Sequence, residues 1–162
     1  MTNIPNKIIV HHSADSSQGD QFFKIDTYHR ERGFPKSEIG YFVGYHFVIN
    51  RLGNVTRARK DTEEGAHTIG QNLSSLGICI EGNFDTELPS EAQEKSLALL
   101  LRGMCEKYKI PANQIFPHRA FRNTSCYGSG LDNWWAARVY LEQEIARLQT
   151  ILIWIQTQIN AK

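Results

Sequence analysis

Hydrophobic and polar positions alternate along the chain with the spacing of strands in some segments and of helices in others. Short β-branched or apolar runs typical of strands lie at 7–10, 44–50, 55–57, 76–80 and 115–116. Apolar residues recur at helical spacing over 20–32, 90–108 and from about 131 onward. Because the two kinds of segment are interleaved, the pattern predicts the α/β class, with a single mixed central β-sheet flanked by helices and a long C-terminal helix.

Local signals sharpen several of these boundaries. The run at 76–80 is almost continuously apolar, which is typical of a central strand covered on both faces. Ser90 is followed three residues later by Gln93, a capping box that opens the middle helix. Gly33 follows the first helical segment, at a position where glycine commonly ends a helix.

The C-terminal segment carries a second pattern. Leucine and isoleucine recur at alternating steps of four and three, at Leu141, Ile145, Leu148, Leu152, Ile155 and Ile159. This spacing is a heptad seam of nearly three repeats. It suits either packing on the parent domain or association with a second copy of the chain, and both interpretations stay open. We therefore divide the chain into a domain at 1–143 and a helical extension at 144–162.

Composition and charge exclude several classes of protein. With 162 residues, of which 41% are hydrophobic, the chain is long and apolar enough to bury one core without disulfides. Its formal net charge of +1 provides no basic surface of the kind that nucleic-acid binding requires. We therefore expect a globular protein with no nucleic-acid partner.

No segment predicts a membrane span or a secretion signal. The apolar run at 151–155 is far shorter than the roughly 20 residues of a spanning helix. The extension contains two cations, Arg147 and Lys162, so contact with anionic lipid is a weak interpretation of it. The first residues lack a charged segment followed by an apolar one. We expect no stable membrane insertion and a cytoplasmic location for the chain as synthesised.

The candidate chemistry lies in two histidines and a cysteine at the ends of strands or in the loops that follow them. His11 directly follows the run at 7–10, His118 follows 115–116, and Cys126 lies in the next loop. Two imidazoles and one thiolate suit Zn²⁺ with one coordination position open, as in a catalytic site. From their spacing alone, His118 and Cys126 are as consistent with two ordinary loop residues as with two metal ligands.

Other cysteines and histidines have plainer interpretations. Cys79 and Cys105 lie within apolar patterns and are expected to pack as small hydrophobic residues. His12 is adjacent to His11, and side chains alternate along a strand, so only one of the two faces a common site.

Six sequence blocks together resemble one protein family in order and spacing. They are 10–14, 44–49, 65–67, 75–78 with 82–84, 117–119 and 124–126. Over about residues 7–143 the chain resembles the type-2 N-acetylmuramoyl-L-alanine amidases, which include peptidoglycan recognition proteins and short zinc amidases of tailed phages. The resemblance implies the mixed-sheet amidase fold. It also implies zinc-dependent hydrolysis of the peptidoglycan amide between the lactyl group of N-acetylmuramic acid and L-alanine.

The resemblance implies roles for individual residues as well. His11, His118 and Cys126 match the family's zinc ligands. Tyr45 and Thr124 match catalytic residues that hydrogen-bond the developing oxyanion, where one donor is typically worth about 10²–10³ in rate.

Substrate contacts are expected from two further histidines. His67 matches a histidine of the cleft that is not a ligand, and we expect it, together with His46, to bind substrate. Residues 61–64 are expected at the lip of the cleft.

Two positions depart from the family pattern. Tyr127 follows Cys126, where the family commonly has proline. Cys79 takes the place of a catalytic glutamate of the related cytoplasmic recycling amidases, with Glu81 two positions further on. The resemblance therefore assigns no general base.

Two functions are consistent with this resemblance. The first is a phage or prophage endolysin that acts on the cell wall after its release. The alternative is a non-catalytic module that binds peptidoglycan or muropeptides. Non-catalytic relatives typically lack the cysteine ligand, so Cys126 favours the enzyme.

Overall fold

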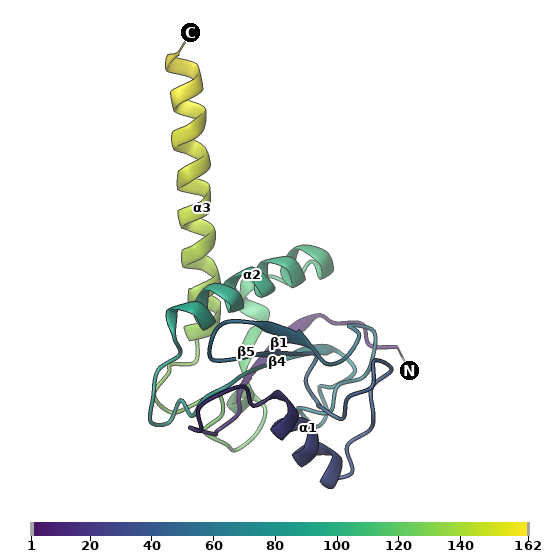
Figure 1. Cartoon of the computed structure of the whole chain (residues 1–162). Helices are drawn as coiled ribbons and strands as arrows, with labels where there is room; N and C mark the ends of the chain where they lie inside the picture. Colours follow the sequence, from purple (N-terminus) through teal and green to yellow (C-terminus); the bar gives the residue numbers. More distant parts are fainter. Residues whose placement is uncertain (1, 162) are drawn as a thin grey trace.

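The structure is a computed structural model that describes residues 2–161, and it contains one five-stranded sheet (Figure 1). The strands are β1 (Lys7–His12), β2 (Phe47–Ile49), β3 (Val55–Arg57), β4 (Ser75–Ile80) and β5 (Ile115–Pro117), in the order β3-β2-β4-β1-β5. β1 is parallel to β4 and β5, β2 is parallel to β4, and β3 is antiparallel to β2. The predicted mixed sheet, with the run at 76–80 in its middle, is confirmed.

Helices cover both faces of this sheet. They are α1 (Phe22–Glu31), α2 (Glu91–Tyr108) and α3 (Trp135–Asn160), with short 3₁₀ turns η1 (Ala112–Gln114) and η2 (His118–Ala120). The predicted capping box opens α2, since Ser90 Oγ accepts from Gln93 N and Gln93 Oε1 accepts from Ser90 N. Gly33 follows α1 with φ of 74°, a conformation that glycine adopts without strain.

The alternation of strand side chains divides the core in two. Leu76, Ile78 and Ile80 of β4 belong to the larger core, which α2 and α3 cover. Cys79 points to the opposite face and joins a smaller core with Phe22 of α1. His11 of β1 pairs with Cys79 in the β1–β4 register. The His11 side chain therefore points to the same face of the sheet as Cys79, the face that α1 covers.

Two predicted elements are shorter than expected. The strand expected over 44–50 is regular only at Phe47–Ile49. Before it, the Gly44 carbonyl accepts from Ala66 N of a loop, and the His46 carbonyl accepts from Ala58 N and Arg59 N beyond the end of β3. The last helix begins at Trp135 rather than near residue 131, because a turn at Asp132 precedes it.

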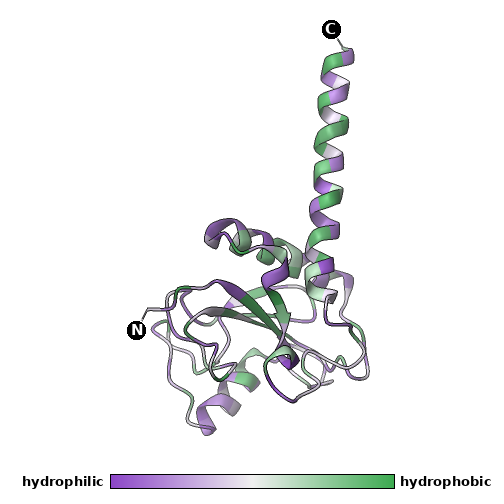
Figure 2. Ribbon diagram, turned by 180° about the vertical axis from the view of Figure 1, so that it is seen from behind, coloured by the Kyte–Doolittle hydropathy of each residue, from purple (hydrophilic) through white to green (hydrophobic). Residues whose placement is uncertain are grey.

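The distal part of α3, residues 141–160, is almost entirely exposed and extends away from the rest of the molecule (Figure 1). The boundary predicted between residues 143 and 144 falls inside this continuous helix. Apolar and polar residues alternate along the projecting part (Figure 2). No helix within residues 2–161 is long and apolar enough to cross a membrane.

Candidate metal centre

Three potential metal ligands meet at the edge where β1 and β5 end. His11, His118 and Cys126 each offer a ligand atom, and these atoms all lie within 4.8 Å of one another. Cys126 Sγ is 3.7 Å from His11 Nδ1, and the rings of His11 and His118 have centroids 4.5 Å apart. Within residues 2–161 this is the one cluster of three or more such donors. The three residues singled out from the sequence are therefore brought together by the fold.

Arg119 and Tyr127 brace the loop that carries Cys126. The Arg119 backbone N–H donates to Cys126 O at 2.8 Å, and its guanidinium donates to the carbonyls of Ser125, Gly128 and Leu131. Tyr127 is fully buried, and its hydroxyl donates to the carbonyl of Asp132 at 2.9 Å. An aromatic anchor thus holds the position where the family commonly has proline.

The outer nitrogen of His11 faces a second histidine. His11 Nε2 lies 3.1 Å from His67 Nδ1 and 3.4 Å from Thr68 Oγ1. The loop that carries these two residues is held by Asn72, whose Oδ1 accepts from both of their backbone N–H groups. Loop 67–72 therefore fixes the orientation of the His11 ring.

Two glycines make room for the His67 ring. A Cβ atom at Gly77 or at Gly65 would come within 2.5 Å of this ring, so both positions require glycine for steric reasons. Gly77 is itself held by His46, whose Nδ1 accepts from the Gly77 N–H at 3.0 Å. The His46 residue is 0% exposed and supports the strand that carries Gly77; its predicted contact with substrate stays a prediction.

The two predicted oxyanion donors differ in burial. Tyr45 is half-buried, with its ring centroid 5.0 Å from that of His11, and it packs against the smaller core that contains Cys79. Thr124 is exposed, and its Oγ1 accepts from Cys126 N at 3.3 Å. Thr124 thus belongs to the loop that carries Cys126, whereas Tyr45 packs against the smaller core under α1.

Burial keeps these donors in their neutral forms. Burial, together with the neighbouring His67 and His118, holds the pKa of His11 well below its usual value. Burial also lowers the pKa of His118 and raises that of the Cys126 thiol to about 12. Neutral imidazole is the form that binds metal, whereas the thiol must lose its proton, which a nearby dication favours.

His12 and Glu81 are further buried polar residues near this end of the sheet. His12 lies on the face opposite His11, as strand alternation predicted, and its Nδ1 accepts from Phe84 N at 3.0 Å. Glu81 is 0% exposed, its Oε1 accepts from Gln21 N, and its Oε2 has no hydrogen-bond partner among residues 2–161. Burial raises the pKa of Glu81 to about 7, so this carboxyl is largely protonated in mildly acidic solution. No local sequence pattern indicates this unpaired oxygen.

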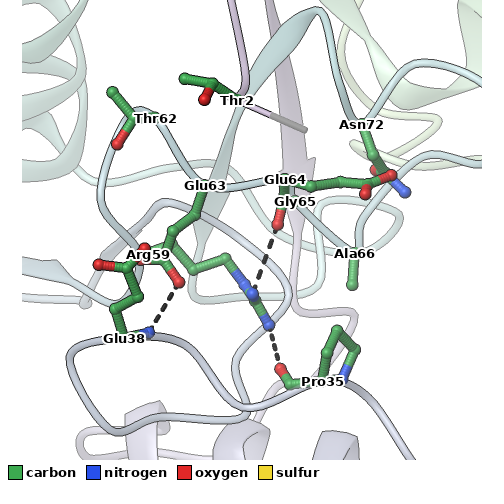
Figure 3. A pocket seen from close by; sticks show the side chains of 10 residues that line it. All are labelled: Thr2, Pro35, Glu38, Arg59, Thr62, Glu63, Glu64, Gly65, Ala66 and Asn72. Atoms are coloured by element: carbon green, nitrogen blue, oxygen red, sulfur yellow. Dashed lines mark hydrogen bonds between the residues drawn. The ribbon is translucent and has the colours of Figure 1, made fainter.

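A separate depression of about 900 Å³ adjoins the site through Gly65 and Ala66 (Figure 3). Thr62, Glu63 and Glu64, from the predicted lip, line it together with Arg59, and none of the three potential metal ligands does. Arg59 donates to the carbonyls of Pro35, Val43 and Glu64, which satisfies its buried guanidinium. The donor cluster thus remains the candidate chemical centre.

Comparison with known proteins decides the family of this chain. A family model described as N-acetylmuramoyl-L-alanine amidase matches residues 1–129. The chain belongs to this amidase family. The matched segment contains all three potential metal ligands and ends before α3 begins.

Relatives of this amidase-family chain include phage endolysins. The endolysins of Enterobacteria phage T3 and Escherichia phage T7 are each 33% identical over 135 residues, covering 79% of this chain and 83% of theirs. Peptidoglycan-recognition protein SC2 of Drosophila melanogaster is 27% identical and covers 82% of this chain and 73% of its own length. Both endolysins and a peptidoglycan-recognition protein are thus similar to it.

Solved structures agree with this assignment. The N-acetylmuramoyl-L-alanine amidase LysC from Clostridium intestinale superposes with a TM-score of 0.72 at 32% identity, covering 88% of this chain and 87% of that one. Bumblebee PGRP-SA superposes with a TM-score of 0.69 at 27% identity, covering 80% of each chain. The predicted amidase fold is confirmed.

Proposed function

We propose that this protein is a zinc-dependent N-acetylmuramoyl-L-alanine amidase that hydrolyses the lactyl–L-alanine amide of peptidoglycan. The observation that carries the proposal is the convergence of two imidazoles and one thiol within 4.8 Å in a member of this family. Similarity to phage endolysins supports a role as an endolysin that acts on the cell wall after release.

The donor set fits zinc. Two histidine nitrogens and one cysteine sulfur are its preferred ligands, and three protein ligands leave the fourth position open for water or substrate. His11 Nδ1, His118 and Cys126 Sγ would hold the ion. When bound, zinc supplies a Lewis acid for the scissile carbonyl and a nucleophile at neutral pH.

His67 acts in this proposal as a positioning residue. With Nδ1 of His11 turned to the metal position, its Nε2 carries the proton and donates to His67 Nδ1. His67 Nε2 then carries its own proton toward Ser75 Oγ, 3.4 Å away. A hydrogen bond to the outer nitrogen of a ligating histidine fixes its tautomer and raises its basicity. This geometry favours a role for His67 in orienting the metal ligand His11 over direct contact with substrate. His46 in turn holds Gly77, the residue against which the His67 ring packs.

Tyr45 and Thr124 are proposed to assist the reaction at the open side of the cluster. The Tyr45 ring lies against His11, with the ring centroids 5.0 Å apart, so its hydroxyl would donate to a substrate oxygen at the centre. Thr124 would donate its hydroxyl proton while its oxygen continues to accept from Cys126 N. Donors aimed at the position where negative charge develops stabilise the transition state.

The alternative function is a non-catalytic peptidoglycan-binding module. Peptidoglycan recognition proteins are among the relatives, so binding to peptidoglycan is common to both proposals. The complete donor set, with Cys126 in place, supports the enzyme.

Purified peptidoglycan provides the test. The full chain should release stem peptides that begin at L-alanine, as identified by mass analysis; a chelator should abolish the release, and added zinc should restore it. Release of shorter glycan fragments would contradict the assigned bond. Retention of the protein on peptidoglycan without any release, in the presence of zinc, would establish the binding module instead.

A further inference from the structure

The distal part of α3 exposes an extended set of large apolar side chains. Nine of them between residues 141 and 159 are between 40% and 67% exposed: Leu141, Ile145, Leu148, Ile151, Leu152, Ile153, Trp154, Ile155 and Ile159. Monomeric soluble proteins seldom expose contiguous apolar patches of more than a few hundred Å². A surface of this extent indicates a partner.

The heptad seam faces away from its own domain. Where α3 passes α2, residues Gln143, Glu144, Ala146, Arg147 and Thr150 line a depression together with Ala98, Leu99 and Arg102. At about 100° per residue, four of these α3 residues lie on the side of the helix opposite the seam, and Glu144, which forms an ion pair with Arg102, lies beside the seam. The parent domain therefore cannot cover the seam, and packing on that domain is excluded as its explanation.

The order of side chains along the seam matches a two-stranded coiled coil. The spacing places Ile145, Leu152 and Ile159 at heptad position a and Leu141, Leu148 and Ile155 at position d. In parallel coiled coils, isoleucine at a with leucine at d favours two strands, and four of these six positions follow that rule. The seam is about 27 Å long at 1.5 Å per residue.

Charges beside the seam also allow a second copy. In a parallel pair, Glu144 would lie beside Gln149 of the second copy, and Ile151 beside its Gln156. No like charges meet in these pairs. Arg147 forms an ion pair with Glu144, so it is not free to attract anionic lipid.

We propose that α3 pairs with α3 of a second copy of this chain through residues 141–159, as a parallel two-stranded coiled coil. The pairing would set two amidase domains side by side at one end of the coiled coil. Both could then contact one peptidoglycan surface, which raises the effective concentration of the second domain after the first has bound.

The test is the mass of the full chain in solution, measured by sedimentation over a range of micromolar concentrations. We expect a concentration-dependent mass that approaches twice the 18.5 kDa of one chain. Leu152→Glu places a charge in the seam and should raise the dimer dissociation constant roughly 100-fold or more. Ile153→Glu is the matched control, because Ile153 is a neighbour of similar exposure, 64% against 55%, that lies off the seam.

Each outcome decides the proposal. Dissociation by Leu152→Glu with a dimer retained in Ile153→Glu supports it, provided that circular dichroism shows both variants folded. A wild-type chain that stays monomeric overturns it, as does a mass of three or four chains or equal dissociation by both variants. If the monomeric chain co-sediments with phosphatidylglycerol vesicles, lipid is the partner instead. Peptidoglycan hydrolysis is measured in a separate assay from the sedimentation mass. A chain that proves monomeric therefore leaves the amidase proposal standing.

Discussion

The metal centre and the distal part of α3 depart from the usual distribution of polar and apolar residues in opposite ways. The centre buries imidazoles and a thiol, whereas the projecting helix exposes leucine, isoleucine and tryptophan to solvent. Burying a polar group costs free energy unless a hydrogen-bond partner or a metal ion compensates for the lost water. A large exposed apolar surface commonly marks a site where another molecule binds. The first departure thus supports the proposed cation at the centre, and the second supports the proposed pairing of α3 with a second chain.

The two regions also differ in how the fold holds them. The donor cluster is positioned by strand register, by the braced ligand loop and by the hydrogen bonds of loop 67–72. The root of α3 is held by Trp135, which packs against Tyr127 with ring centroids 5.3 Å apart, and Glu144 adds an ion pair with Arg102 of α2. Substitutions should therefore act on stability and catalysis in the first region and on association in the second.

The two tryptophans of α3 give the largest expected contrast in stability. Trp135 is 5% exposed and donates to Glu94, whereas Trp154 is 63% exposed and lies off the seam. We expect Trp135→Ala to lower the free energy of unfolding by about 3–5 kcal/mol and Trp154→Ala to change it by less than about 0.5 kcal/mol. Urea unfolding measures both, and similar losses in the two variants would contradict the division of α3 into a packed root and a free distal part.

Tyr45→Phe tests the chemical role of the centre. The variant keeps the ring against His11 and removes only the hydroxyl, so zinc content should stay at the wild-type level. We expect the rate of stem-peptide release to fall about 10²–10³-fold. Wild-type turnover in this variant would remove Tyr45 from the mechanism.

Glu81→Gln tests the unpaired buried carboxyl. The pKa of Glu81 is raised by burial from 4.5 to about 7, so the folded state retains a proton that the unfolded chain releases. The stability contributed by this group is complete below about pH 4.5 and is lost as the pH rises to about 7, a change of up to about 3 kcal/mol. Unfolding of wild type and variant at about pH 5 and about pH 8 should show a weaker pH dependence in the variant. The same pH dependence in both would contradict the raised pKa.

His67→Gln tests the support of the ligand His11. Loss of the hydrogen bond to the outer nitrogen should weaken zinc affinity about 10–100-fold, measured by competition with a chelating dye. His29→Gln is the matched control, because His29 is also buried and accepts from Gly44 N without a hydrogen bond to His11. Zinc affinity that is unchanged by His67→Gln, with slower hydrolysis, would return His67 to substrate binding.

Much of the fold was predictable from local pattern. The apolar run at 76–80 indicated the central strand, Ser90 and Gln93 marked the start of α2, and alternation separated His11 from His12. The beginning of α3 was wrong by a few residues, because the hydrogen bonds of Asp132 make a turn that periodicity does not register. Local pattern therefore predicts the elements better than their ends.

The site was predictable only in its donors. The contact between His67 and His11 depends on a loop conformation that the Asn72 side chain holds, and no spacing rule encodes it. The burial of Glu81 and the contact between the Tyr45 and His11 rings arise from packing between segments far apart in the chain. These are tertiary effects, so a single sequence carries no local signal for them.

X-ray absorption at the zinc edge of the purified full chain measures the ligands of the proposed metal ion. We expect one zinc per chain, with one sulfur ligand at about 2.3 Å and nitrogen ligands at about 2.0–2.1 Å, and loss of the sulfur signal in Cys126→Ser. A zinc spectrum without sulfur, or one that Cys126→Ser leaves unchanged, would contradict the proposed metal site.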